Sequence, residues 1–438
     1  MKKDKFMIAL FGLLFSTVLL HAQNTTPISK EEVLERFSTK NVAIKISKQQ
    51  YLQAKADFSQ TNAVYLPNVS VSYTGISTNS PLIAFGTKLN QQVVAPADFD
   101  PNLLNNPDRI TDFSTRIAFQ QPLVNLDGFQ QRNAAKAKMQ AVELQGTRTK
   151  EYLFFEVEKA YMQLQLAYKT VEVLEKAFEA SSANKTWAEN SLAQGYLQKA
   201  DVLAVEVRVT EVKNQLLSAK STVENTSNYL SFLMNENDAS ILYPSDTLRV
   251  IEFAETTTRS VSENRADIKA MGLASEAREA MYTSDRMTFM PRLNAFGSYE
   301  LHDNQILQGG GDGYLIGAQL SWSLFEGSRR FGKVQKSKAE LNKSRLQYDQ
   351  YISQSQLELN QANRMFADAK NSLALSELAL EQSKESLKIR TNRFKQGLEK
   401  TSDLLLAETQ YAQKQLNYYS TIFQHNYALA YVQFLAKN

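Results

Sequence analysis

The sequence QGYLQKADVLAVE at residues 194–206 occurs again, in altered form, as QGLEKTSDLLLAE at residues 396–408. Both copies read Gln-Gly, five residues, Asp, one residue, Leu, two residues and Glu, and each stands between two long helical patterns. A glycine directly after a helical pattern and an aspartate in the first turn of the next one mark a helix end and a helix start. The sequence therefore predicts a helical hairpin turn that is used twice.

The residues around these turns also recur. Ile44 corresponds to Ile268, and Pro67 corresponds to Pro291 at the same spacing. We interpret this as a gene duplication that left two tandem repeats. The expected parts are repeat one at about 28–235, a linker or equatorial segment at about 236–261, and repeat two at about 262–437.

Long helices account for most of the pattern, because glycine and proline are scarce at 16 and 9 residues. The expected helices lie at about 28–65, 127–193, 200–233, 327–395 and 402–435, with a further one before Pro291. In the second of these, apolar residues follow steps of four and three, which is typical of a left-handed coiled coil. This seam is Leu153, Val157, Ala160, Leu164, Ala167, Val171, Leu174 and Phe178, and its counterpart in repeat two is Leu359, Ala362, Phe366, Ala369, Leu373, Ser376 and Leu380.

Each repeat also carries two segments in which apolar and polar residues alternate, a pattern that predicts strands with one apolar face. The expected strands lie at about 69–76, 113–121, 293–301 and 314–323. The residues from Ser77 to about Asp112, rich in Pro, Asn and Asp, are predicted to form a loop. The run Gly309–Gly313 is interpreted as a hairpin turn, because no Lys-Ser/Thr pair follows it and the next element is a strand.

Composition excludes several classes of function. Cysteine is absent, and histidine occurs only at His21, His302 and His425, so disulfides, thiolate zinc sites and histidine-dependent sites have no support. The net charge of +3, without a Lys/Arg-rich block, gives no support to nucleic-acid binding. We therefore predict no catalytic, cofactor-binding or metal-binding residues, and the protein is not expected to be an enzyme.

The amino terminus predicts export from the cytoplasm. A basic start is followed by an apolar run from Phe6 to Leu20 and by the small residue Ala22, which is the layout of a secretory signal peptide over residues 1–22. The alternative is a transmembrane anchor, for which the apolar run is short. Residues 23–438 are then expected to form the mature chain.

Four strands cannot close a barrel, since membrane barrels begin at about eight strands. Open strand edges in lipid would leave backbone groups unpaired at several kcal/mol each. If these strands cross a membrane, several copies of the chain must share one barrel, and three copies would supply about twelve strands. The long helices likewise need neighbours to cover their apolar seams. The predicted fold is therefore mostly α, with helical hairpins forming an α-barrel and four strands per copy forming a membrane β-barrel.

The layout resembles the TolC-type outer-membrane efflux proteins, also called outer membrane factors. Besides the twin turns, the resemblance rests on LPNV at 66–69 and MPRL at 290–293 before the first strand of each repeat, and on QPL at 121–123 and SLFEG at 323–327 after the second. It implies a homotrimer with a twelve-stranded barrel in the outer membrane and a helical tunnel in the periplasm. It also implies docking on a periplasmic adaptor (membrane fusion) protein and on an inner-membrane transporter of the RND or ABC type.

The resemblance places the twin turns at the periplasmic tip of the tunnel. Asp403 matches a position whose carboxylates ring the narrowest part of the pore, and Leu406 stands where a second, often acidic, ring would be. The family's Tyr three residues before the second glycine and its Arg two residues after it are replaced by Phe394 and Glu399. The residues expected at the tip and at adaptor docking are Gly195, Asp201, Leu203, Glu206, Phe394, Gly397, Glu399, Leu405 and Glu408.

Several of these residues also have a simpler structural interpretation. Asp201 and Asp403 would each stabilise a helix dipole, and Glu206 and Glu408 are expected to lie on a solvated helix face. Tyr73, Tyr299, Tyr314 and Trp322 are expected to form an aromatic belt at the membrane interface, in contact with outer-membrane lipid; the alternative is the core of a soluble sheet.

The predicted function is a passive export duct of a tripartite efflux or type I secretion system. It would lead from the periplasm to the exterior. The alternative is a secreted or periplasmic coiled-coil scaffold without a pore. That alternative accounts for the helical seams and the signal peptide, but it leaves the strands of both repeats unexplained.

Overall fold

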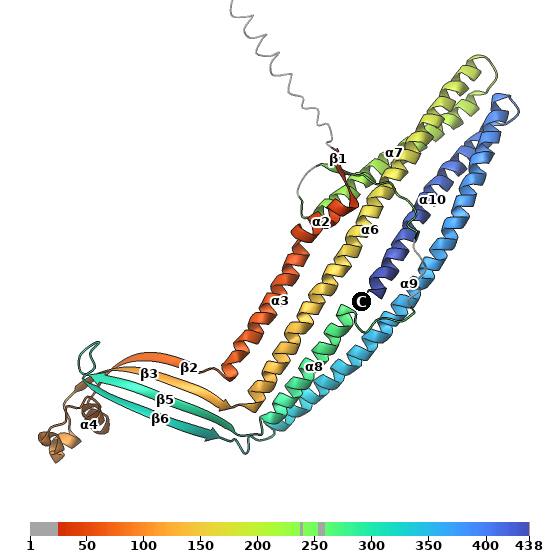
Figure 1. Ribbon diagram of the computed structural model, residues 1–438. Helices are drawn as coiled ribbons and strands as arrows, with labels where there is room; N and C mark the ends of the chain where they lie inside the picture. Colours follow the sequence, from red (N-terminus) through yellow and green to blue (C-terminus); the bar gives the residue numbers. More distant parts are fainter. Residues whose placement is uncertain (1–24, 237–239, 253–258, 438) are drawn as a thin grey trace, which may run out of the picture. The chain divides into compact units, whose positions relative to one another are not determined.

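The computed structural model describes residues 25–236, 240–252 and 259–437 (Figure 1). The predicted signal peptide lies outside the described residues. The elements in chain order are β1 (Thr25–Ile28), α2 (Lys30–Lys40), α3 (Val42–Gln60), η1 (Thr61–Val64), β2 (Asn68–Thr78), α4 (Pro81–Asn90), η2 (Pro96–Phe99), α5 (Pro101–Asn105), β3 (Ile110–Val124), α6 (Leu126–Ala193), α7 (Lys199–Leu233), β4 (Ile241–Pro244), α8 (Ala266–Met287), β5 (Arg292–Asp303), β6 (Gly311–Ser321), α9 (Arg329–Lys395) and α10 (Thr401–Ala436).

The chain forms two compact units. Of the described residues, the helical unit comprises 25–47, 147–236, 240–252, 259–265 and 353–437, and the sheet unit comprises 48–146 and 266–352. Helices α6 and α9 each contribute residues to both units. The fold is mostly helical with a small number of strands, as the sequence predicts.

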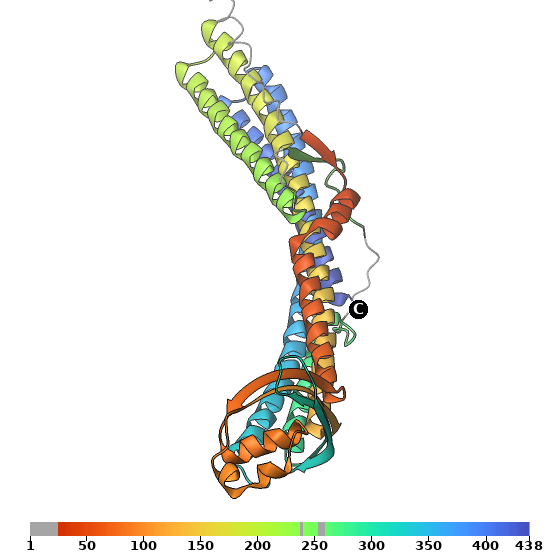
Figure 2. The ribbon, with the colours of Figure 1, turned by 90° about the vertical axis from the view of Figure 1, so that its left-hand side faces the viewer.

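In the sheet unit, the described strands β2, β3, β5 and β6 form one antiparallel sheet in the order β2-β3-β5-β6. All four lie over the segments predicted to be strands, and each extends by a few residues beyond the predicted bounds at one end or both. Figure 2 shows these strands curving together, with the short helices of residues 81–105 at their far end. Strand β2 and strand β6 are the two edges of this sheet.

The two faces of the sheet differ in polarity, because paired residues share a face and neighbours along a strand alternate. One face, here the apolar face, carries Val69, Val71, Tyr73, Phe113, Ile117, Phe119, Leu293, Tyr299, Leu301, Tyr314, Ile316 and Leu320. The other, here the polar face, carries Ser70, Ser72, Thr74, Asp112, Ser114, Arg116, Gln120, Asn294, Ser298, Glu300, His302 and Gln319, together with the apolar residues Ile76, Phe296 and Leu315. The alternation of the sequence thus becomes a two-faced sheet.

The segment between β2 and β3 corrects the predicted loop, since it contains α4, η2 and α5. Pro81, Pro96 and Pro101 each occupy the first turn of one of these short helices. A proline is favourable there because the first helical N–H has no partner within the helix and the ring presets φ. The prolines that suggested a loop are therefore helix starts.

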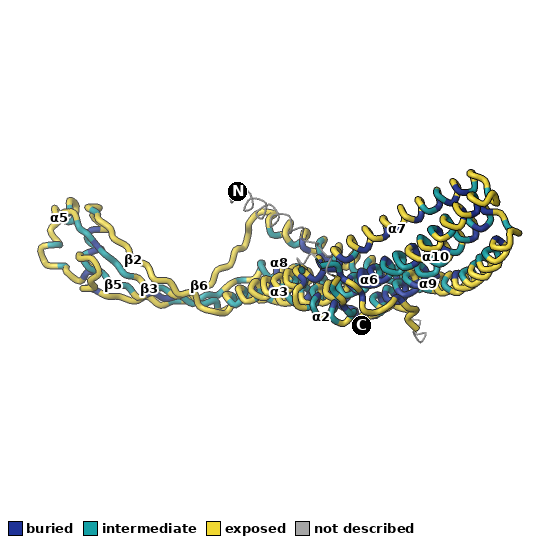
Figure 3. Tube along the Cα trace, turned by 90° about the horizontal axis from the view of Figure 1, so that it is seen from above, coloured by how far each residue is buried: buried dark blue, intermediate teal, exposed yellow. Residues whose placement is uncertain are grey.

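The helical unit is built from two helical hairpins, α6 with α7 and α9 with α10. The predicted seams lie inside it: Val157, Leu164 and Leu359 are fully buried. Figure 3 shows the buried positions recurring along α6 and α9, as coiled-coil packing requires.

A small parallel sheet in the helical unit was not predicted. Strand β1 pairs with β4 over Thr25↔Ile241 to Ile28↔Pro244. Ile28 and Leu242 from these strands join Val33, Phe37 and Leu164 in one buried cluster. The pairing joins segments more than 200 residues apart, so no local pattern indicates it.

The first predicted helix, at 28–65, is divided at Asn41. The Asn41 side-chain oxygen accepts a hydrogen bond from the Ile44 backbone N–H at 3.1 Å, and its Nδ2 donates to the Leu233 carbonyl at 2.7 Å. An asparagine that bonds backbone groups in this way favours a helix start over a helix interior.

In the part of the chain that the structure describes, no helix holds a stretch both long and apolar enough to span a membrane.

Candidate functional site: the tips of the helical hairpins

The first hairpin turn is a Schellman motif. Gly195 has a φ of 78°, which favours glycine because a Cβ would be strained there. Tyr196 N–H donates to the Ser191 carbonyl at 2.9 Å, and Gly195 N–H donates to the Leu192 carbonyl at 3.0 Å. These two bonds satisfy carbonyls that the end of α6 would otherwise leave unpaired.

The second turn has the same bonds. Gly397 has a φ of 73°. Leu398 N–H donates to the Arg393 carbonyl and Gly397 N–H to the Phe394 carbonyl, both at 2.9 Å. The sequence match between the two turns therefore reflects one backbone motif built twice.

The equivalent aspartates have different surroundings. Asp201 Oδ2 accepts the backbone N–H of Gln198 at 3.2 Å, so this side chain caps the start of α7. The half-buried Asp403 side chain, in the first turn of α10, has no hydrogen bond or ion pair with any residue that the structure describes. Leu406, one turn later, is 56% exposed.

Glu399, which replaces the family's arginine, is held within its own hairpin. Its carboxylate lies 2.6 Å from Arg390 Nη1 and 2.8 Å from Arg393 Nε. The carboxylate is largely buried by these two arginines of α9. At this turn the glutamate thus follows the glycine, and its two arginine partners precede it.

Phe394 joins the two hairpins. It is 7% exposed, and its ring centroid lies 4.6 Å from that of Trp187 on α6. The sequence analysis did not identify Trp187, although the chain has only two tryptophans and this one stands six residues before the predicted end of its helix. An apolar ring contact thus stands at the position where the family pattern has a tyrosine hydroxyl.

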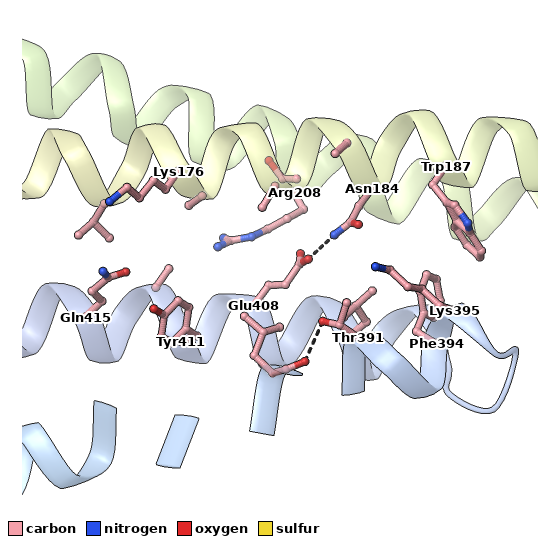
Figure 4. Close-up of a pocket in the computed structure, with 18 residues that line it drawn as sticks. Lys176, Asn184, Trp187, Arg208, Thr391, Phe394, Lys395, Glu408, Tyr411 and Gln415 are labelled. Carbon is pink, nitrogen blue, oxygen red and sulfur yellow. Dashed lines mark hydrogen bonds between the residues drawn. The ribbon is translucent and has the colours of Figure 1, made fainter. Parts of the chain in front are cut away.

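A cavity of about 460 Å³ lies beside this junction, between the two hairpins (Figure 4). It is lined by Asn184 from α6, Arg208 from α7, Phe394 from α9 and Glu408 from α10. The cavity therefore combines apolar walls with a small group of polar side chains.

Glu408 corrects the prediction of a solvated face. Its side chain points into the cavity and accepts a hydrogen bond from Asn184 Nδ2 of the other hairpin (Figure 4). Burial raises the pKa of Glu408, against the opposing effects of the Asn184 hydrogen bond and the Arg208 charge. Its counterpart Glu206 is half-buried and pairs with Lys185 at 3.3 Å within the first hairpin.

Leu203 and Leu405, both predicted to contact the adaptor, have different surroundings. Leu203 is exposed on α7. Leu405 instead packs against Ala188, Val202 and Val205 of the first hairpin, so it belongs to the contact between hairpins. The periodicity of α10 alone does not distinguish a leucine that faces a neighbouring hairpin from one that faces solvent.

The four aromatic residues predicted at a membrane interface lie in the sheet unit. Tyr73, Tyr299 and Tyr314 are exposed on the apolar face, and Tyr299 pairs directly with Tyr314. Trp322 follows β6 at the opposite end of that strand, where its Nε1 donates to the Phe289 carbonyl at 2.9 Å.

Comparison with known proteins identifies the domain. Residues 258–422 match the family described as Outer membrane efflux protein. No curated protein matches the chain.

Solved structures share the fold over nearly the whole chain. A membrane protein from Pseudomonas aeruginosa has a TM-score of 0.81 at 16% identity, with 93% of each chain covered. The CmeC outer membrane channel of Campylobacter jejuni has a TM-score of 0.80 at 15% identity over 93% of this chain and 85% of its own. The outer membrane protein VceC from Vibrio cholerae has a TM-score of 0.79 at 17% identity over 93% and 96%. At such identities the likeness shows the fold alone.

The resemblance drawn from the sequence is thereby confirmed. The family comprises channels of the outer membrane with a helical tunnel in the periplasm, and its members are not enzymes. Residues 258–422 thus carry an Outer membrane efflux protein domain, and the chain as a whole has the fold of the solved outer-membrane channels.

Proposed function

We propose that the protein is the passive, trimeric export duct of a tripartite efflux or type I secretion system. It would lead from the periplasm to the exterior and dock on a periplasmic adaptor and an inner-membrane transporter of the RND or ABC type. The observation that carries the proposal is a two-faced sheet of four described strands with both edges, β2 and β6, unpaired.

A sheet of this kind has few stable environments. Its apolar face would aggregate in water, and its unpaired edges would cost several kcal/mol per backbone group in lipid. Both problems are solved if β6 of one copy pairs with β2 of the next and the ring closes. Three copies would then give about twelve strands, within the range of outer-membrane barrels.

The aromatic residues support this placement. Strand geometry puts Tyr314 and Trp322 about 26 Å apart along the chain, which a tilt of roughly 40° reduces to about 20 Å of height. The apolar band of outer-membrane barrels is about 25 Å tall and is bordered by aromatic girdles. Tyr73 and Tyr299 would join Tyr314 at the outer border, and Trp322 would mark the inner one.

The hairpin tips would form the periplasmic end. In a ring of three copies, the unpaired carboxylates of Asp403 would form a negative constriction, followed by an apolar one at Leu406. For the adaptor, we propose a docking surface on α7, where Leu203 and Val207 are exposed beside Glu206. The turns at Gly195 and Gly397 would flank it.

The test is the mass of the purified protein in detergent together with its single-channel conductance in a planar bilayer. A trimer with small, cation-selective conductance would support the duct with a tip that rests closed. A trimer with large conductance would support the duct with an open tip. A monomer or dimer without conductance would refute the duct and favour the coiled-coil scaffold.

A further inference from the structure

The segment of residues 81–105, here the cap segment, is anchored on the polar face of the sheet. Gln91 Nε2 donates to the Thr111 carbonyl and to Asp112 Oδ1, both at 2.9 Å. Asp112 is 4% exposed, and its other oxygen lies 2.9 Å from His302 Nδ1 on β5. A buried carboxylate with two partners is a rigid attachment point.

The cap segment also crosses the width of the sheet. It begins after β2, one edge strand, and its helix α4 ends against β6, the other edge. A Cβ added to Gly311 would lie only 2.2 Å from the Asn90 carbonyl oxygen, so the backbones of α4 and β6 are in direct contact. Gly311 pairs with His302 and therefore shares the polar face with Asp112. The cap segment thus lies over the polar face, at the end of the strands that is far from α3 and α6.

Apolar side chains of the cap segment have no cover in the single chain. Leu82 is 84% exposed, and Ile83, Leu89, Val93 and Phe99 are each at least half exposed. Several large apolar side chains exposed on one short segment are typical of a contact with another molecule.

Lipid is a poor candidate for that contact, because in the proposed duct lipid would cover the opposite, apolar face. The polar face would line the lumen, and β2 and β6 would be the edges at which copies join. A segment that runs from one joining edge to the other on the lumenal side would face the same segment of the neighbouring copies.

We propose that the cap segments of the three copies contact one another through these apolar residues and narrow the outer mouth of the duct. This inference rests on the proposed function. It identifies a second copy of the chain as the partner of this surface.

Cross-linking tests the contact. The chain has no cysteine, so Leu82→Cys, Leu89→Cys and Phe99→Cys can each be introduced as the single thiol. In the purified trimer, a short bis-maleimide is expected to link two copies at one or more of these positions. The matched control is Ile316→Cys on the apolar face, which should not be linked and should react with a lipid-soluble maleimide. Absence of any link at all three cap positions would overturn the proposal, as would labelling of these positions by the lipid-soluble reagent.

Conductance tests the narrowing. Replacement of residues 81–105 by a short Gly-Ser turn is expected to raise single-channel conductance about twofold or more, if the tip is not the tighter constriction. The recording is therefore made in the Asp403→Ala background as well as in the wild type. Unchanged conductance of an intact trimer in both backgrounds would refute the narrowing. If the deletion variant fails to assemble, Gln91→Leu is tested instead. This substitution removes the hydrogen bond between the cap segment and Asp112 and leaves the strands unaltered, so the same rise in single-channel conductance is expected.

The two proposals fail separately. A wild-type chain that forms no conducting trimer would refute the duct itself. A conducting trimer without cap cross-links and without a rise in conductance would refute only the cap.

Discussion

Asp201 and Asp403 stand at the same position of the two hairpin turns, yet only Asp201 has a backbone partner. A capping side chain contributes to helix stability, whereas an unpaired carboxylate near a helix start is available to ions. Within the described residues, one of the two turns therefore has a capping carboxylate and the other has a carboxylate without a partner. The two turns share a backbone motif, but their side chains have different partners.

We expect Asp403→Ala to lower block of the channel by trivalent cations in planar-bilayer recordings, because three negative charges would leave the constriction. Asp201→Ala is the matched control. It should leave block unchanged and cost about 0.5–2 kcal/mol of stability through the lost cap. Equal block in wild type and Asp403→Ala would remove Asp403 from the constriction.

The half-buried Glu408 predicts a pH dependence of stability. Its raised pKa means that the folded state favours the protonated form. Its stabilising effect is therefore complete below the ordinary glutamate pKa of 4.5 and is lost as the pH rises through the raised, folded value. Glu408→Gln keeps the acceptor for Asn184 without the charge. We expect this variant to melt at the wild-type temperature in acid and several degrees higher at neutral pH, as followed by circular dichroism.

The control is Glu206→Gln on the first hairpin, whose carboxylate pairs with Lys185 and should show no such gain. A Glu408→Gln melting temperature equal to that of the wild type at neutral pH would contradict the burial of this carboxylate.

At the scale of elements, side chains that bond the backbone decide where helices begin and end. The Schellman bonds at Gly195 and Gly397 end α6 and α9. Prolines start the short helices of the cap segment. Asn41 divides what the sequence presents as one helix, because its side chain bonds both the start of α3 and the end of α7.

We expect Asn41→Ala to lower the free energy of unfolding by roughly 1–2 kcal/mol, since a helix cap is lost and the buried Leu233 carbonyl loses its donor. The exposed Thr39, which bonds only carbonyls of its own helix, provides the control Thr39→Ala, with an expected change within about 0.5 kcal/mol. Denaturant unfolding measures both. A loss no larger in Asn41→Ala than in Thr39→Ala would show that the division of the helix does not depend on this side chain.

At the scale of the whole molecule, the two-faced sheet limits how the protein can assemble. Its apolar face and unpaired edges have no partner within the described chain, so assembly and membrane insertion are expected to occur together. The polarity of each strand position should then decide whether a charge is tolerated.

Neighbouring residues of β6 provide a matched pair for this prediction. Ile316 lies on the apolar face at 71% exposure, and Leu315 lies on the polar face at 55% exposure. Ile316→Lys is expected to cost about 2–4 kcal/mol near the middle of the bilayer and to reduce the yield of heat-modifiable trimer in outer-membrane fractions. Leu315→Lys should assemble like the wild type. The opposite order of yields would reverse the assignment of the lipid-facing side.

Elements whose causes are local can be predicted from the amino-acid sequence alone. A period of 3.5 predicted the coiled-coil seams, a period of two predicted the strands, and glycine followed by aspartate predicted the hairpin turns. Each of these signals arises from residues within one or two turns of each other, so it can be seen in the sequence alone. The family resemblance rests on the same local signals, taken in order.

Contacts between residues far apart in the chain are visible only in the three-dimensional fold. The β1–β4 pairing, the burial of Glu408 against Asn184, the contact of Leu405 with the first hairpin and the attachment of Gln91 to Asp112 all join separate elements. Helical and strand periodicities show that a face is apolar or polar, but they do not show which neighbour covers it. That choice depends on packing between elements, because the free energy of burial is gained only when a particular neighbour excludes water.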